Sequence, residues 1–235
     1  MSGNRTSPFS VSETARGIDE GSNSYPCLPC PGRLENHACR AISDITKAIA
    51  NLRASELDFV AELIASTLIT QKQVMILGNG GSCATASHMA TDLRLMAHEI
   101  RLQVSVNALH ESASLMTAMA NDYGFAESGG ILVETSASLD DVLLIFSCSG
   151  RSPNLVNAAR VARRLGVLTI LIGSQLAPND FPARHRVLIQ SQDYSVIESV
   201  HSAVAHIIMD LLRIRFCVAS SRHPRSLYAV TANGH

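Results

Sequence analysis

The stretch VMILGNGGSCATASHMATDL, residues 74–93, holds the pattern that decides the fold. It begins with the apolar run VMIL, passes through the turn GNGGS, and continues as a helical pattern that carries His88 and Asp92 four residues apart. A short apolar run of this kind is typical of a strand that is buried on both faces of a sheet. The stretch therefore indicates the strand, loop and helix unit of an α/β protein.

The same alternation of strand and helix continues along the chain. Further strands are predicted at residues 101–109, 141–149, 167–173 and 185–190, and helices at residues 82–97, 112–120, 153–165 and 195–216. Before the first strand, apolar residues recur at helical spacing over residues 41–70, which predicts one long helix or two helices broken around Ser55. Continuous apolar strands separated by helices indicate a mostly parallel sheet that is covered on both faces.

The two ends of the chain differ in composition from this core. Residues 1–36 are rich in Ser, Gly, Asn and Pro, so we expect a flexible extension before a single domain at residues 37–218. Residues 219–235 are expected to form a polar tail. The motif CLPC at residues 27–30, followed by His37 and Cys39, resembles half of a zinc knuckle. Because a second well-spaced pair is missing, we interpret it as a coincidence.

Composition narrows the class of partner. The formal net charge of -1 gives no basic excess for nucleic acid, and the aromatic content of 4% argues against base-stacking platforms. The N-terminus lacks an apolar signal core, and the chain lacks the run of about 18 uncharged apolar residues that a membrane span requires. The scattered cysteines indicate a reducing compartment. We expect a cytoplasmic protein that binds a small molecule or another copy of itself.

Two loops that follow predicted strands are built from glycine and hydroxyl residues. They are GNGGS at residues 78–82 and SCSGRSPN at residues 147–154. Such loops lie at the carboxyl edge of a parallel sheet, where backbone N–H groups and helix N-termini favour anions. Ordinary strand-to-helix turns use the same residue types. The pair nevertheless predicts a compact phosphoester ligand, because GNGGS lacks the lysine of a P-loop and the spacing of a dinucleotide fingerprint.

Two helices carry groups that could move protons or hold a metal ion. His88 and Asp92 share a helix face, while Glu198 and His206 lie eight residues apart on the last predicted helix, about 80° around its axis. Two histidines and two carboxylates can form a mixed site for zinc or a similar divalent ion. Spacing alone favours a simpler interpretation, in which one pair is an exposed ion pair and the other lies in a subunit interface.

Four segments in order resemble the phosphoheptose isomerase group of the sugar-isomerase (SIS) domain family. They are GNGGSCATASHMATDL, LMTAMANDYGF, SCSGRSPNLVNAARVARRLGV and VIESVHSAVAH. The resemblance implies a flavodoxin-like, three-layer α/β sandwich and a homotetramer with sites at subunit interfaces. It further implies that a ketose phosphate such as sedoheptulose 7-phosphate is converted to the aldose phosphate through an enediol.

The resemblance also assigns roles by position. It places a substrate-binding loop at Asn79, Gly80, Gly81 and Ser82, and a phosphate cradle at Ser147, Cys148, Ser149 and Ser152. It places zinc binding and acid/base chemistry at His88, Asp92, Glu198 and His206. We assign Asp92 and His206 as the base and acid, and His88 and Glu198 mainly as ligands. Glu198 and Ser112 are also expected to contact the substrate.

Several positions depart from the family pattern. Asp92 stands where these enzymes usually have Glu, Glu198 where they have Gln, Cys148 where they have Thr, and Ser112 where a sugar-binding Asp is common. We therefore expect an isomerase with one of two substrates, either a heptulose phosphate or a longer octulose phosphate. The alternative is a non-catalytic regulator that binds sugar phosphates, or a tetrameric adaptor. The joint presence of two histidines and two carboxylates favours the enzyme.

Overall fold

The computed structural model of the chain describes residues 31–219. The chain divides into two compact units, residues 1–38 and 39–235, and the first unit contributes only the start of helix α1 (Pro31–Ala50) to the described range. All other described elements belong to the second unit. The cysteines of the CLPC motif, most of the expected N-terminal extension and the expected tail from residue 220 lie outside the described residues.

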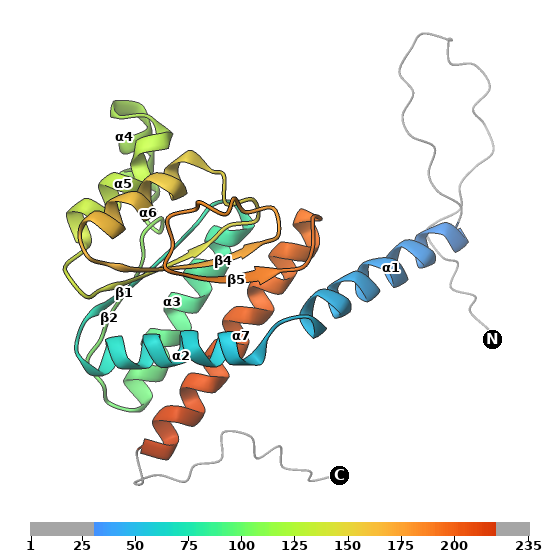
Figure 1. Ribbon diagram of the computed structural model, residues 1–235, viewed down its shortest axis with the longest axis horizontal. Helices are drawn as coiled ribbons and strands as arrows, with labels where there is room; N and C mark the ends of the chain where they lie inside the picture. The colour runs from blue at the N-terminus through green and yellow to red at the C-terminus, as the bar shows by residue number, and fades with distance from the viewer. Residues whose placement is uncertain (1–30, 220–235) are drawn as a thin grey trace, which may run out of the picture. The chain divides into compact units, whose positions relative to one another are not determined.

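A five-stranded parallel sheet forms the centre of the second unit (Figure 1). Its strands are β1 (Gln73–Gly78), β2 (Ser105–Ala108), β3 (Val142–Phe146), β4 (Leu168–Ser174) and β5 (His185–Ile189). They lie in the order β2-β1-β3-β4-β5, and every neighbouring pair is parallel. This is the strand order of flavodoxin-like folds, so the predicted fold class is confirmed.

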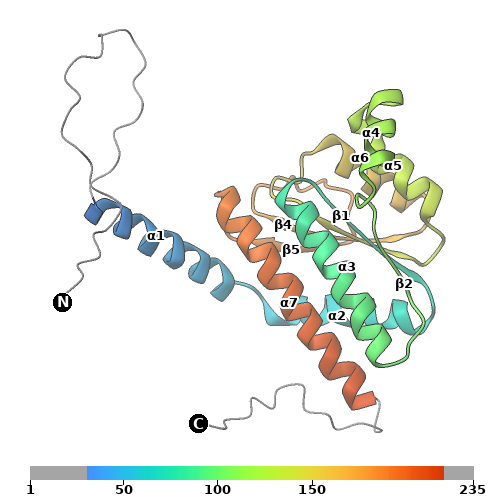
Figure 2. The same ribbon diagram turned by 180° about the vertical axis from the view of Figure 1, so that it is seen from behind.

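Helices cover both faces of the sheet and complete three layers (Figure 2). One face packs against α2 (Ala54–Ile69), α3 (Gly81–Glu99) and α7 (Tyr194–Ala219), and the other against α4 (Ala113–Asp122), α5 (Phe125–Ser136) and α6 (Pro153–Arg164). Side chains along a strand alternate between these two cores, as Val74 and Met75 show. Because both faces are buried, the strands read as continuous apolar runs.

The register of the central strands aligns their carboxyl ends. Gly78 at the end of β1 lies opposite Phe146 at the end of β3, and Phe146 lies opposite Ile172 of β4. A buried carboxylate holds the amino ends of β1 and β3 together. Asp141, just before β3, accepts hydrogen bonds from the backbone N–H groups of Gln73 (2.8 Å) and Ser138 (2.7 Å). The loops after β1 and β3 therefore emerge side by side.

The helices before the sheet differ from the sequence expectation in their bounds. The helical segment predicted over residues 41–70 is two helices, and the break lies between Ala50 and Ala54, just before Ser55. Helix α1 begins at Pro31, ten residues earlier than predicted, within the stretch expected to be an extension. Proline suits the first turn of a helix because its missing N–H has no intrahelical partner there.

Helix α5 has no counterpart in the sequence prediction. Its sequence FAESGGILVETS contains two adjacent glycines, which weaken a helical pattern. In the structure these glycines allow close packing of α5 on α6, because a Cβ on Gly129 would overlap the Asn154 carbonyl and a Cβ on Gly130 would lie 2.7 Å from Nδ2 of Asn157. Packing of α5 on α6 thus overrides the low helix propensity of the pair.

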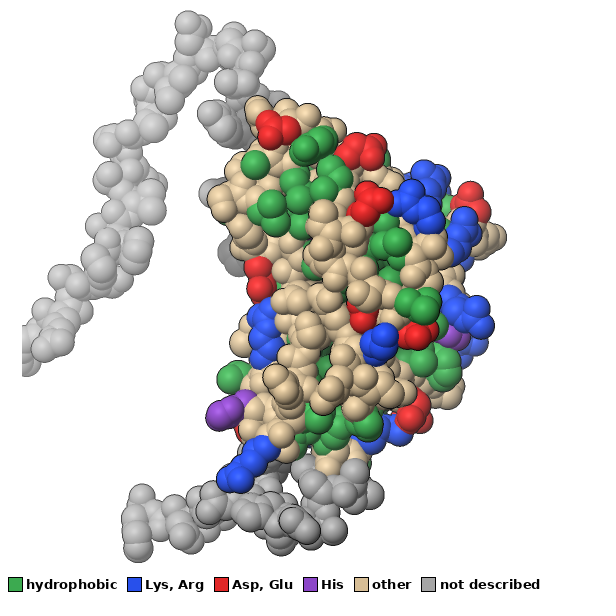
Figure 3. Space-filling model, turned by 90° about the vertical axis from the view of Figure 1, so that its left-hand side faces the viewer, with side chains coloured by type: hydrophobic (Ala, Val, Ile, Leu, Met, Phe, Trp, Pro, Cys, Tyr) green, Lys and Arg blue, Asp and Glu red, His purple; other side chains and the backbone are tan. Residues whose placement is uncertain are grey.

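Helix α7 is the described helix that is long and apolar enough, by length and composition, to cross a membrane. Half of its apolar window Tyr194–Phe216 is buried inside the protein, where it packs against α2 and α3. A core helix of this kind does not indicate a membrane protein. On the face drawn in Figure 3, basic and acidic side chains are interspersed, in keeping with the net charge of -1.

Candidate active site

The two glycine- and serine-rich loops meet in a small cavity at the carboxyl edge of the sheet. The cavity has a volume of about 90 Å³. Its lining consists of Asn79, Ser82, Phe146, Ser147, Cys148, Ser149, Ser152, Leu155, Tyr194 and Glu198. We call this cavity the serine pocket. Six of these residues were predicted as substrate-binding from the two loops, and the structure brings all six together.

Three helices begin at the serine pocket, and two of them have free N-termini. Side chains do not cap α3 at Gly80 or α6 at Ser152, whereas Asp193 accepts hydrogen bonds at the start of α7 from the N–H groups of Ser195 (2.8 Å) and Val196 (3.4 Å). Those contacts lower the pKa of the Asp193 carboxyl, beginning with its bonds to Ser195. The uncapped N–H groups of α3 and α6 leave donors and positive dipole ends for an anion.

The serine hydroxyls retain their own protons for a ligand. Ser147 Oγ accepts from the N–H of Gly150 (3.1 Å), and Ser149 Oγ accepts from the N–H of Arg151 (3.2 Å). Gly150 has a φ of +60°, and a Cβ there would lie 2.8 Å from Cβ of Ala177, so glycine is required at this turn. A hydroxyl that accepts from the backbone can still donate outward, which suits a phosphate cradle.

A reciprocal amide pair joins the two loops. The side chain of Asn79 donates to Oδ1 of Asn154 and accepts from its Nδ2, with both distances 2.9 Å. Asn154 is fully buried in the first turn of α6. The structure thus uses the Asn79 amide, which was predicted to contact substrate, first to hold the loops together. Asn154 was missed because nothing in its sequence context marks its partner.

Cys148 lies between the two serines and is buried. Burial raises the pKa of its thiol, hydrogen bonding to Ser82 partly opposes that shift, and the Glu198 carboxylate raises the pKa further. The thiol is therefore protonated at neutral pH and can serve as a weak donor where the family pattern has a hydroxyl.

Glu198 lies in the serine pocket and outside the histidine cluster described below. A Cβ on Gly81 would lie 2.5 Å from its Oε2, so the carboxylate packs directly over the glycine turn. Among the described residues, the group whose ligand atoms lie close enough together to hold a metal ion does not include Glu198. Its predicted place among the zinc ligands has no support within one chain, while its predicted place at the substrate does.

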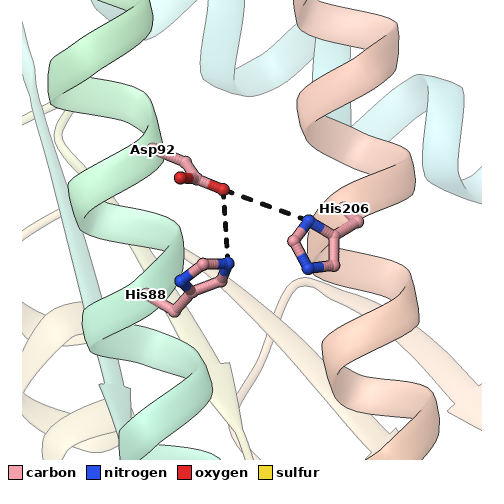
Figure 4. Close-up of side chains that lie close together, drawn as sticks. All are labelled: His88, Asp92 and His206. Atoms are coloured by element: carbon pink, nitrogen blue, oxygen red, sulfur yellow. Dashed lines mark ion pairs between the residues drawn. The ribbon is translucent and has the colours of Figure 1, made fainter.

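His88, Asp92 and His206 form a cluster further along α3 and α7, two of the helices that begin at the serine pocket (Figure 4). Oδ2 of Asp92 lies 3.5 Å from Nε2 of His88 and 4.0 Å from Nδ1 of His206. The two imidazole rings meet edge to face, with centroids 5.0 Å apart. The side chains of His88 and His206 are 53% and 58% exposed, so the cluster opens to solvent.

The spacing of this cluster fits a divalent ion. One ligand atom from each residue lies within 4.8 Å of the others. Tetrahedral zinc with N and O ligands at about 2.1 Å separates its ligand atoms by about 3.4 Å, so a small closing movement suffices. Two imidazoles and a carboxylate are a donor set that zinc accepts.

Two other predicted or unassigned residues have structural roles. Ser112 is exposed and caps α4 by accepting from the N–H of Leu115 at 3.3 Å, and it does not line the serine pocket. Its predicted contact with the sugar stays a prediction. His110, to which the sequence assigned no role, places Nδ1 2.7 Å from the carbonyl of Gly78 and so fixes the end of β1. Burial lowers its pKa.

A larger groove of about 920 Å³ lies at the opposite edge of the sheet. Its charged residues are balanced, with Asp140 and Asp180 beside Arg163 and Arg184. Ligands of doubly wound sheets bind beyond the carboxyl ends of the strands, which is where the serine pocket lies. We therefore take the smaller cavity as the candidate site.

Comparison with known proteins shows the family. Residues 38–174 match the family model of the SIS domain. The phosphoheptose isomerase of Bradyrhizobium sp. (strain ORS 278) is 33% identical over 182 residues, which cover 76% of this chain and 91% of the relative. The chain belongs to the phosphoheptose isomerase group of the SIS domain family. A second relative of that name, from Helicobacter pylori (strain P12), is 34% identical over 66% of this chain and 81% of its own length.

Solved structures of this group have the same fold as the SIS-domain chain. The phosphoheptose isomerase of Francisella tularensis matches with a TM-score of 0.67 at 22% identity, over 79% of this chain and 98% of its own. That of Neisseria gonorrhoeae matches with a TM-score of 0.66 at 24% identity, over 77% and 98%. At these identities the likeness supports the fold, and the roles of residues rest on the geometry given above.

Proposed function

We propose that the chain is an aldose-ketose isomerase that acts on a ketose phosphate, either sedoheptulose 7-phosphate or a longer octulose phosphate. Membership in the phosphoheptose isomerase group makes it a phosphosugar isomerase. One observation carries the assignment to this site. A pocket of hydrogen-bond donors lies at the uncapped N-termini of α3 and α6, and a histidine and carboxylate cluster lies further along α3 and α7, which also begins at the pocket. One part can hold a phosphate while the other serves the carbonyl end of the sugar.

The phosphate would bind in the serine pocket. Ser147, Ser149 and Ser152 offer hydroxyl protons, and the N-termini of α3 and α6 offer backbone N–H groups. Charge-assisted hydrogen bonds to such groups are stronger than neutral ones. Glu198 also lines this pocket, but its carboxylate is negatively charged and has no proton to donate to a phosphate, so we assign it to the sugar hydroxyls.

The chemistry requires a base and an acid. To convert a ketose to an aldose, the base removes a proton from C1 to give the enediol and returns it to C2, while the acid exchanges protons between O1 and O2. We assign Asp92 as the base, because it is the half-buried carboxylate of the cluster, and His206 as the acid. The 4.0 Å separation of Oδ2 of Asp92 and Nδ1 of His206 allows both to reach the same two carbons.

The cofactor we propose is a divalent ion, zinc, held by His88, Asp92 and His206. When bound, such an ion polarises the two reacting oxygens and stabilises the negative charge of the enediolate. The predicted fourth ligand, Glu198, would have to turn out of the serine pocket. Binding of one zinc ion per chain, lost on replacement of His88 by alanine, would support this site.

We further propose a cytoplasmic homotetramer. Support comes from α4, where Met119 is the buried residue and the apolar side chains of Leu115, Tyr123 and Phe125 at or next to the helix are 42%, 66% and 50% exposed. A helix with so little cover in its own chain is suited to contact another copy. Sedimentation of the purified protein would measure the assembly.

The test of the function is an NMR assay in deuterium oxide. Zinc-loaded protein is incubated with seven- and eight-carbon ketose phosphates, and deuterium is followed into the aldose product. Incorporation at C2 for one sugar is expected, and the His206→Ala variant is the matched control. If the phosphates bind and no label appears with any of them, the chain is a non-catalytic sugar-phosphate binder.

A further inference from the structure

His201 is buried in contact with two residues that line the serine pocket, Ser82 and Phe146. It is the histidine on α7 whose side chain is fully buried, at 0% exposure, and it lies one turn after Glu198. Its ring meets the ring of Phe146 edge to face at a centroid distance of 5.3 Å, and Phe146 itself lines the pocket. The reaction outlined above gives His201 no part.

One hydrogen bond connects His201 to the ligand site. Its Nδ1 lies 3.2 Å from Oγ of Ser82, which is buried at the start of α3 and lines the serine pocket. The other ring nitrogen, Nε2, is buried and makes no well-formed hydrogen bond among the described residues, although the backbone carbonyl of Ile172 lies near enough to the ring to oppose part of the lowering of its pKa. A buried polar atom without a partner costs free energy, and an apolar side chain of similar size would avoid that cost.

The ring is a neutral hydrogen-bonding group under ordinary conditions. Burial lowers the pKa of His201 to about 4, so it brings no positive charge to the pocket. In the tautomer that carries its proton on Nδ1, the ring donates to Oγ of Ser82, which fixes the orientation of the Ser82 side chain and leaves the hydroxyl proton free for a ligand. A serine hydroxyl without such a partner samples several rotamers, and part of its binding energy for a ligand is then lost to ordering.

We propose that His201 is a positioning residue, which holds the Ser82 hydroxyl in the orientation that binds the phosphate of the substrate. This inference rests on the proposed function, since it assigns the serine pocket to the phosphate. His201 acts only through Ser82 and touches no substrate atom.

The experiment measures binding of inorganic phosphate by titration calorimetry to the full chain and three single variants. His201→Leu fills the space and removes the hydrogen bond, His201→Asn places a polar atom near the position of Nδ1, and Ser82→Ala removes the hydroxyl. Loss of one hydrogen bond to a charged ligand is expected to weaken phosphate binding about tenfold in His201→Leu and Ser82→Ala. His201→Asn is expected to restore most of the affinity.

The double variant Ser82→Ala with His201→Leu separates positioning from a general structural effect. If His201 acts through Ser82, the double variant binds phosphate as weakly as Ser82→Ala alone. An additional tenfold loss in the double variant, or wild-type affinity in His201→Leu, would overturn the inference. Thermal unfolding of every variant checks that each one is folded.

The same titrations keep this inference apart from the proposed function. If Ser82→Ala binds phosphate as tightly as the wild type, the serine pocket is not the phosphate site and the proposed function fails in that part. If Ser82→Ala weakens binding while His201→Leu does not, the pocket assignment stands and only the role of His201 is wrong.

Discussion

The histidines His201 and His206 lie five residues apart on the same helix, about one and a half turns, and face opposite environments. His201 is fully buried behind the serine pocket, whereas the side chain of His206 is 58% exposed in a cluster whose closest ionic contact is 3.5 Å. The binding part of the site is thus preformed within one chain, with paired amides and oriented hydroxyls. The chemical part is open, and it requires a substrate, an ion or a second copy of the chain to exclude water.

The largest effect is expected at the open part of the site. Replacement of His206 by alanine should lower the turnover number by about 10²- to 10⁴-fold, the usual contribution of a general acid or base. Phosphate binding should stay unchanged, because the serine pocket does not include His206. Steady-state kinetics and calorimetry measure the two quantities separately.

A matched control for that variant is His98→Ala, since His98 is an exposed histidine at the end of the same helix that carries His88. It should turn over substrate at the wild-type rate. Full turnover by His206→Ala would remove His206 from the reaction and leave Asp92 without its assigned partner.

The buried His201 should make the free energy of unfolding depend on pH. Its pKa is about 4 in the folded protein against 6.5 for an unburied group. Between these values the unfolded chain binds a proton that the folded chain does not, so acid favours unfolding. The free energy of unfolding is therefore unaffected by this group above about pH 6.5. It falls by about 3 kcal/mol in all as the pH is lowered towards 4.

Urea unfolding at a series of pH values measures this effect. His201→Leu should lose less stability than the wild type between pH 6.5 and 4, because leucine binds no proton. Equal losses in the two proteins would show that the buried ring is not the group that titrates.

The sheet and the meeting of its loops could be predicted from the sequence because both follow from local pattern. Strands β1 and β3 are apolar runs buried on both faces, and parallel strands place their carboxyl ends at one edge. Helix α5 could not be predicted, because Gly129 and Gly130 are helical only through their packing on α6.

In the site too, the sequence predicts local relations between residues better than contacts between distant segments. The spacing of His88 and Asp92 fixes a shared face, and the structure adds His206 from the facing helix. The family resemblance grouped Glu198 with them, yet its separation of eight residues from His206 places it about 12 Å away along the helix axis. The pairing of Asn79 and Asn154, which lie 75 residues apart, depends on tertiary structure alone.

That amide pair gives a smaller test of the preformed pocket. Asn154→Ala leaves the polar atoms of Asn79 without their partner, which should cost about 1–3 kcal/mol of unfolding free energy. Phosphate affinity should fall as well, because the two loops lose their connection. Asn157→Ala is the control, since Asn157 lies on the same helix and bonds to the exposed Glu127. Equal destabilisation by the two substitutions would contradict a special role for the pair.

The smallest effect is expected from the charge of Glu198. Its carboxylate is the acidic group that lines the serine pocket, and it opposes a bound phosphate. Glu198→Gln keeps the shape and removes the charge, so phosphate should bind a few-fold more tightly, on the order of 1 kcal/mol.

The gain from Glu198→Gln should shrink as salt screens the interaction. Glu111→Gln, at an exposed carboxylate outside the pocket, is the control for a general change in net charge. If Glu198→Gln binds phosphate no more tightly than wild type at low salt, the carboxylate faces a compensating cation when the anion is bound. Its predicted place at the metal would then gain the support that the isolated chain does not provide.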